Sequence, residues 1–192
     1  MSDAANAFRL RRHTQTLLAI LVVSTLVGAG TAVNAGWHAW HDPHAFLTND
    51  FSTADMAGKI RPDQPLNVGM SYVRERPATL RVDSARPRVL LNTAGADITV
   101  SVCRVDPSRA DASIGSVYGD LSKWCREVVD PAGARMQLRD AAVSDQLILT
   151  IRPTRPGVVM VWGLDVTYGY GHRHGTQHVG ANVRFKVPGQ AQ

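Results

Sequence analysis

Lysine is scarce in this chain, because only Lys59, Lys123 and Lys186 are lysines among 192 residues. Arginine therefore supplies most of the 21 basic residues, against 16 acidic ones, and the formal net charge is +5. The first 36 residues hold three arginines and one aspartate, which leaves 18 basic against 15 acidic residues in the remainder. A nucleic-acid-binding surface needs a dense basic stripe, so this small and dispersed excess excludes a nucleic-acid partner. The preference for arginine over lysine is typical of GC-rich bacterial coding sequences.

The chain also lacks a glycine-rich phosphate-binding loop and the strand–helix alternation that would carry one. No cysteine lies near a histidine in the sequence, as a cysteine nucleophile with a local base would require. No other grouping of residues has the spacing of a catalytic site. The sequence therefore predicts neither a cofactor nor an enzyme.

Cysteine is limited to Cys103 and Cys125. In an exported chain an even number predicts a disulfide. A closed loop of about 23 residues would stabilise the fold by about 3 kcal/mol. Cys103 differs in parity from Val102, so the bridge is expected on the outer or edge side of its strand. Two buried free thiols are the alternative.

An uncharged segment, LLAILVVSTLVGAGTAV, occupies residues 17–33. About 20 apolar residues at about 1.5 Å each cross a hydrocarbon core of about 30 Å, so residues 16–36 are predicted to form a transmembrane helix. The arginines before it would keep residues 1–15 in the cytoplasm as a tail and place the rest outside. The alternative is a secretory signal peptide cleaved after Ala35, which follows the small-residue pattern of cleavage sites. Both interpretations export the remainder of the chain.

Small residues recur every fourth position in the apolar segment, at Ser24, Gly28 and Ala32. Such a stripe lets two membrane helices approach closely and favours self-association. Small residues are also common in membrane helices without that role. Self-association through this stripe is therefore one of two open interpretations.

Residues 66–188 are predicted to form a domain built of β-sheets. A stalk over 37–65 is expected before it, and a disordered tail over 189–192 after it. Apolar residues alternate with period two, as in half-buried strands. The longest runs place Val158, Met160, Trp162, Leu164, Val166, Tyr168 and Tyr170 on one face, and Val179, Ala181, Val183, Phe185 and Val187 on another. Turn residues, among them Arg86-Pro87, separate the runs, and 119–129 resembles a short helix or turn. The pattern predicts an all-β, immunoglobulin-like antiparallel β-sandwich, preceded by the transmembrane helix.

Three histidines lie within seven positions in YGYGHRHGTQHVG, at His172, His174 and His178. The flanking runs predict a hairpin whose glycines, Gly171 and Gly175, supply positive φ. The exposed hairpin tip is a candidate contact surface for a partner, formed by Tyr170, His172, Arg173 and His174. A metal site is the alternative, because imidazoles bind Zn²⁺ or Cu²⁺. The remaining interpretations are a set of polar residues on an exposed turn and a pH sensor formed by titrating histidines.

A second histidine cluster, WHAWHDPH, places His38 and His41 at helical spacing. These two residues complete the set of candidate metal ligands. Neither cluster includes a cysteine or glutamate at a recognisable ligand spacing.

The segment from Pro156 to Phe185 contains Gly163-x-Asp165-Val166-x-Tyr168 and Gly175-Thr176-Gln177-x-x-Gly180. It resembles the carboxy-terminal part of small, uncharacterised single-pass membrane proteins of GC-rich bacteria, which have an extracytoplasmic β-rich domain. The resemblance covers about a sixth of the chain. It implies the same architecture here and carries no activity.

The sequence thus favours a membrane-anchored, extracytoplasmic binding or assembly module of the bacterial cell envelope. Its expected partners are the lipid bilayer, through the amino-terminal helix, and an envelope protein or ligand. One alternative is a histidine-dependent metal-binding envelope protein or enzyme. The other is a structural accessory subunit of a membrane complex.

Overall fold

The computed structural model describes residues 45–46, 53–56, 64–71, 78–106, 108, 114–139 and 144–189. Ten strands and a 3-10 helix lie in these ranges. They are β1 (Thr53–Met56), β2 (Leu66–Gly69), β3 (Ala78–Asn92), β4 (Asp97–Val105), β5 (Ser116–Tyr118), η1 (Leu121–Lys123), β6 (Cys125–Val129), β7 (Arg135–Leu138), β8 (Gln146–Arg152), β9 (Gly157–Tyr170) and β10 (Arg173–Val187). The predicted all-β fold is confirmed for this part of the chain.

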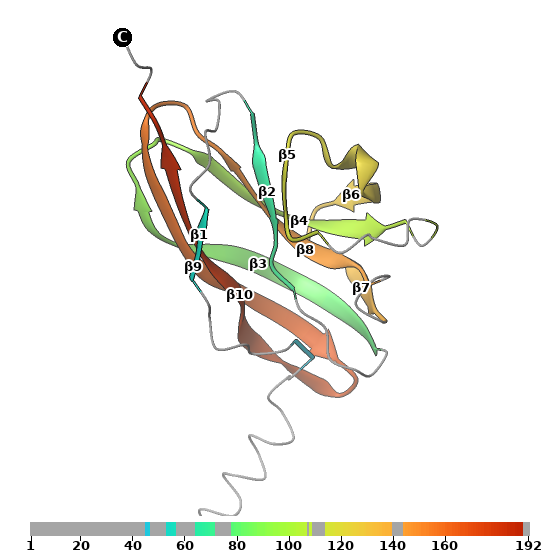
Figure 1. Ribbon diagram of the computed structural model, residues 1–192. Coiled ribbons are helices and arrows are strands. Elements are labelled where there is room, and N and C mark those ends of the chain that lie inside the picture. Colours follow the sequence, from blue (N-terminus) through green and yellow to red (C-terminus); the bar gives the residue numbers. More distant parts are fainter. Residues whose placement is uncertain are drawn as a thin grey trace, which may run out of the picture. The chain divides into compact units, whose positions relative to one another are not determined.

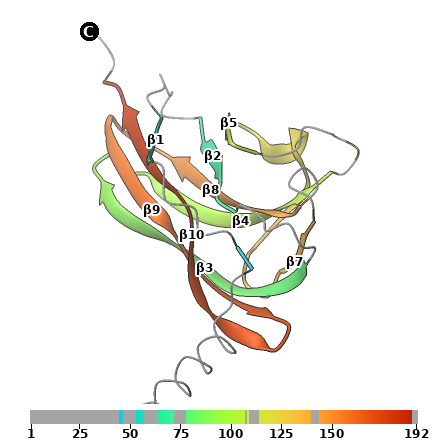
Figure 2. The same cartoon turned by 60° about the horizontal axis from the view of Figure 1, so that its bottom comes forward.

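The strands form two five-stranded sheets that pack as a sandwich (Figures 1 and 2). The first sheet has the order β1-β10-β9-β3-β7, and the second has the order β5-β2-β8-β4-β6. Neighbouring strands are antiparallel except β1, which runs parallel to β10. The chain crosses between the sheets repeatedly, so each sheet contains strands from distant parts of the sequence.

The main core lies between the sheets and takes inward side chains from both. Leu66, Leu80, Leu149, Val166 and Phe185 are each at most 1% exposed. Burying a side chain of this size contributes about 1.5–3 kcal/mol before the cost of ordering the chain. The alternating apolar residues predicted for β2, β8 and the last strand therefore drive the association of the two sheets.

The predicted turn at Arg86-Pro87 is wrong, because β3 runs through it without interruption. The β3–β9 register shifts between Pro87 and Val89. Proline has no N–H for a sheet ladder, so it is tolerated where a strand has one neighbour or a bulge. Both conditions hold at Pro87. This part of β3 pairs with β9 but not with β7, which pairs only with Ala78–Arg81, and the register shift marks a bulge.

The predicted inward face of β9 is wrong in its first half. Val159 and Val161 are buried at 0% and 1% exposure, whereas Trp162 is 40% exposed. The parity changes at Gly163, which has a φ of 62° and lies opposite a register shift in β10 between Val179 and Asn182. A β-bulge adds one residue to a strand and re-aims the side chains that follow. The inward residues of β9 are therefore odd-numbered before Gly163 and even-numbered after it.

The segment expected as a stalk, 37–65, contributes to the sandwich. Ala45 and Phe46 are buried in the main core, and β1 extends the first sheet. The backbone N–H of Ala45 donates to the Tyr168 hydroxyl (2.8 Å), and the Gln177 side chain donates to the Phe46 carbonyl (2.9 Å). The boundary expected at residue 66 therefore excludes part of the fold.

Several expected features lie outside the described residues: the transmembrane helix or signal peptide at 16–36, the small-residue stripe, His38 and His41. Within the described ranges no helix has the length and apolar character needed to cross a bilayer.

The predicted disulfide is confirmed, because Cys103 of β4 is bonded to Cys125 of β6. Both cysteines are buried in a second apolar cluster, separate from the main core, together with Val105, Ile114 and Ile148. The segment expected as a short helix or turn divides into η1, which Asp120 caps, and strand β6. The bridge thus ties the edge strand β6 to its neighbour β4, on the side of the second sheet that faces away from the main core.

Gly180→Ala should destabilise the sandwich, because Gly180 has a φ of 93° and an added Cβ would lie 2.8 Å from the Met70 carbonyl oxygen. A strained backbone of this kind costs about 1–3 kcal/mol. Gly115→Ala is the matched control, since no atom lies within 4 Å of the added Cβ. Chemical unfolding of both variants measures the difference, and equal stabilities would contradict the bulge geometry.

Candidate functional site

The β9–β10 hairpin displays the residues of YGYGHRHGTQHVG in three cross-strand rows. A turn at Gly171 and His172 joins the strands, and the positive φ of Gly171 (60°) matches a type II′ turn. Gly175, expected to need a positive φ, lies within extended β10 instead. The rows on the outer face pair Gly169 with His174, Thr167 with Thr176, and Asp165 with His178.

The first row continues across four strands of the sheet. His174 is opposite Gly169, Gly169 is opposite Arg81 of β3, and Arg81 is opposite Arg135 of β7. Side chains opposite one another in a sheet lie on the same face. Arg135, Arg81 and His174 therefore share the outer face, and Gly169 leaves a gap between two of them.

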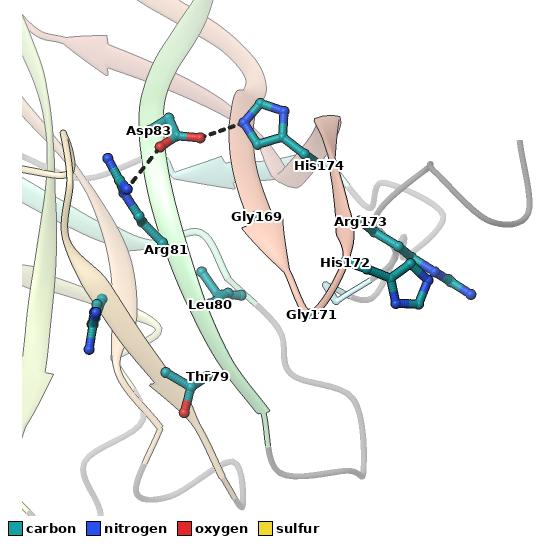
Figure 3. Close-up of a pocket in the computed structure, with 10 residues that line it drawn as sticks. Thr79, Leu80, Arg81, Asp83, Gly169, Gly171, His172, Arg173 and His174 are labelled. Carbon is teal, nitrogen blue, oxygen red and sulfur yellow. Dashed lines mark hydrogen bonds and ion pairs between the residues drawn. The ribbon is translucent and has the colours of Figure 1, made fainter.

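An open depression of about 510 Å³ lies at this row. Its walls are Arg81, Asp83, Arg135, Gly169, His174 and the turn at residues 171–173 (Figure 3), and we name it the hairpin groove. Asp83 is the only carboxylate among the lining residues, and it contacts two of the other lining residues. One carboxylate oxygen lies 3.4 Å from Arg81 Nε, and the other lies 2.7 Å from His174 Nε2.

Arg135 has no carboxylate partner among the described residues, and it stands directly opposite Arg81. Like charges at opposite positions of a sheet destabilise it. The groove therefore concentrates positive charge beyond what one aspartate neutralises. This arrangement suits a negatively charged group better than a metal ion.

The structure brings part of the predicted contact surface together. His172, Arg173 and His174 all line the groove, but Figure 3 shows the side chains of His172 and Arg173 directed away from the Asp83–His174 pair. Tyr170 is half-buried and packs against the main core. Sequence reasoning missed Arg81, Asp83 and Arg135. Their alternation with the apolar residues Leu80 and Met136 could have placed them on the outer face of the sheet. Nothing in the sequence indicates that they pair with the hairpin.

A second polar cluster lies further along the same outer face. The Arg88 guanidinium donates to both oxygens of Asp165 (3.1 and 3.0 Å), and His178 Nδ1 donates to Asp165 Oδ1 (2.8 Å). The Trp162 ring lies 5.5 Å from the His178 ring and 5.1 Å from the Arg88 guanidinium. Burial raises the pKa of Asp165, but the hydrogen bonds from His178 and Arg88 outweigh it and hold the pKa below its usual value.

The three hairpin histidines have different surroundings. His174 contacts Asp83, His178 contacts Asp165, and His172 lies in the turn. Among the described residues no group of three or more His, Cys, Asp or Glu side chains could hold a metal ion. The candidate ligands His38 and His41 lie outside those ranges.

Comparisons with known proteins give no family or relative for this chain. No protein-family model, curated protein or solved structure matches it. The hairpin groove and the cluster of Arg88, Asp165 and His178 are therefore the features on which a functional proposal can rest.

Asp165→Asn should make the unfolding free energy fall less steeply as the pH is lowered into the acid range. A carboxylate with a lowered folded pKa contributes stability above its usual pKa of about 4, and loses it as the pH falls through the folded value. Because the Asp165 side chain is 36% exposed, solvent screening limits this contribution to about 1 kcal/mol or less.

Unfolding free energies measured between about pH 7 and pH 2 test this. Arg88→Gln should flatten the same range, since it removes the bidentate partner. If the unfolding free energy of Asp165→Asn fell with decreasing pH as steeply as that of wild type, the Asp165 carboxylate would contribute nothing to the acid sensitivity.

Proposed function

We propose that the chain is an extracytoplasmic binding or assembly module of the bacterial cell envelope, with the hairpin groove as its contact surface. The observation that carries the proposal is the pair of opposed arginines on β7 and β3, Arg135 and Arg81, which one aspartate, Asp83, neutralises only in part. Exposed like charges on neighbouring strands cost stability. A binding role gives a reason for their presence.

Export is the second part of the proposal. The Cys103–Cys125 disulfide supports it, because disulfides persist in oxidising compartments outside the cytoplasm. We place the chain in the cytoplasmic membrane as a single-pass protein held by residues 16–36, with residues 1–15 inside; release after Ala35 is the alternative. The resemblance to small single-pass membrane proteins with an extracytoplasmic β-rich domain agrees with this placement.

We also propose that the sandwich has a general immunoglobulin-like architecture. Two face-to-face sheets, connections that cross between them and a long final hairpin support a general immunoglobulin-like architecture. Domains of this architecture present loops and strand ends at the two ends of the sandwich for recognition. The β9–β10 turn occupies one such end (Figure 1).

Arg173→Ala combined with His174→Ala should reduce the partners captured by crosslinking in whole cells. The double variant should fold normally, because His174 is 66% exposed and an exposed ion pair contributes little. The matched control is Arg126→Ala combined with Arg152→Ala, which removes two exposed arginines of the second sheet. A partner profile that is the same in wild type and in both double variants would remove the hairpin groove as the contact surface.

A further inference from the structure

The hairpin groove contains two arginines that no obvious structural need brings together. Arg81 and Arg135 are opposite one another on β3 and β7, and both side chains are exposed. Asp83 already contacts Arg81 and His174, so Arg135 has no carboxylate partner in the described part of the chain. Arginines at opposite positions of two paired strands present their guanidinium donors on one face of the sheet.

We propose that the hairpin groove binds a phosphate monoester group, which rests on its proposed role as the contact surface. A phosphate monoester carries a charge of about −1.5 to −2 at neutral pH and three acceptor oxygens. Those oxygens can accept hydrogen bonds from Arg135 and from the Arg81 nitrogens that do not face Asp83, and the charge offsets the positive charge that Asp83 leaves. A carboxylate has two oxygens and half the charge, so it satisfies one guanidinium and leaves the other.

Gly169 keeps the groove open beside Arg81. It sits between Arg81 and His174 in the row, and an added Cβ would meet His174 Cδ2 at 3.8 Å, an ordinary contact. Its φ is outside the region that only glycine tolerates. A larger side chain at position 169 would therefore occupy the groove without straining the strand.

The size of the groove indicates that the phosphate is part of a larger molecule. Its volume of about 510 Å³ exceeds the volume of a phosphate ion, and Thr79 and Leu80 extend the lining beyond the arginines. The organic part can come from a soluble phosphorylated compound or from a lipid with a terminal phosphate. Both present the same chemistry to Arg81 and Arg135.

Calorimetric titration of the full chain in a neutral detergent tests the proposal. The probes are glycerol 3-phosphate, inorganic phosphate, and the short-chain lipids dihexanoyl phosphatidic acid and dihexanoyl phosphatidylcholine, with acetate as the carboxylate control. We expect the phosphate monoesters to bind, with an affinity that falls as salt increases. Acetate and phosphatidylcholine should not bind. Preference for phosphatidic acid over glycerol 3-phosphate would identify a lipid source, and the reverse would identify a soluble one.

The variants separate binding from folding. Arg135→Gln and Arg81→Gln should each weaken phosphate binding about tenfold, as expected for one charge-assisted contact. Arg135→Gln should also leave the unfolding temperature equal to or above that of wild type, because it removes a like-charge pair. A merely structural arginine would lower it. Gly169→Val should abolish binding with the fold retained.

Arg126→Gln is the charge-matched control on the second sheet and should bind like wild type. The proposal is overturned if no phosphate probe binds, if acetate binds as tightly, or if Arg126→Gln and Arg135→Gln weaken binding equally. If phosphate fails to bind while partner capture still depends on Arg173 and His174, the ligand class is wrong and the contact surface stands.

Discussion

The register of the β9–β10 hairpin is the constraint on which the rest of the structure depends. One residue of slip would move every side chain of a strand to the other face of the sheet. In this hairpin, Gly163 and Gly180 absorb the register shift at the bulge, so Val161 and Leu164 both face the core. The outer face after the bulge then carries Asp165, Thr167 and Gly169 in order.

The two faces of the hairpin have different energetic roles. On the inner face, buried Tyr168 and Gln177 hydrogen-bond to each other and to the backbone of Ala45 and Phe46. A buried polar group without a partner costs free energy, so this network fixes how the 45–46 segment meets the hairpin. The outer face instead carries exposed charges whose pairing is incomplete at Arg135. Stability is therefore concentrated inside the sandwich, and recognition is proposed for its outer surface.

Much of the sandwich could be predicted from local sequence patterns. Period-two apolar residues located β2, β4, β8 and β10, and the even number of cysteines predicted the bridge. The phase change at Gly163 and the passage of β3 through Pro87 were missed, because both depend on pairing with a neighbouring strand. The short strands β5 and β7 were also missed, since each offers too few alternating apolar residues, whereas the alternating run of β2 continues in the sequence to Met70 and Tyr72.

The groove was harder to predict than the fold. The hairpin tip was recognisable from GHRHG, and three of its four expected contact residues line the groove. Arg81 and Arg135 could not be associated with it, because they are separated from His174 by 93 and 39 positions in the sequence. Only the register of four strands brings them into one row.

That row can be measured directly by nuclear Overhauser contacts between backbone protons in the isotope-labelled full chain. The four-strand register predicts that Gly169 contacts His174 on one side and Arg81 on the other, and that Arg81 also contacts Arg135. Contacts from Gly169 to Arg173 or Gly175 as its directly opposite partner, or the absence of the Arg81–Arg135 contact, would contradict it, because the side chains of the groove would then lie on different faces.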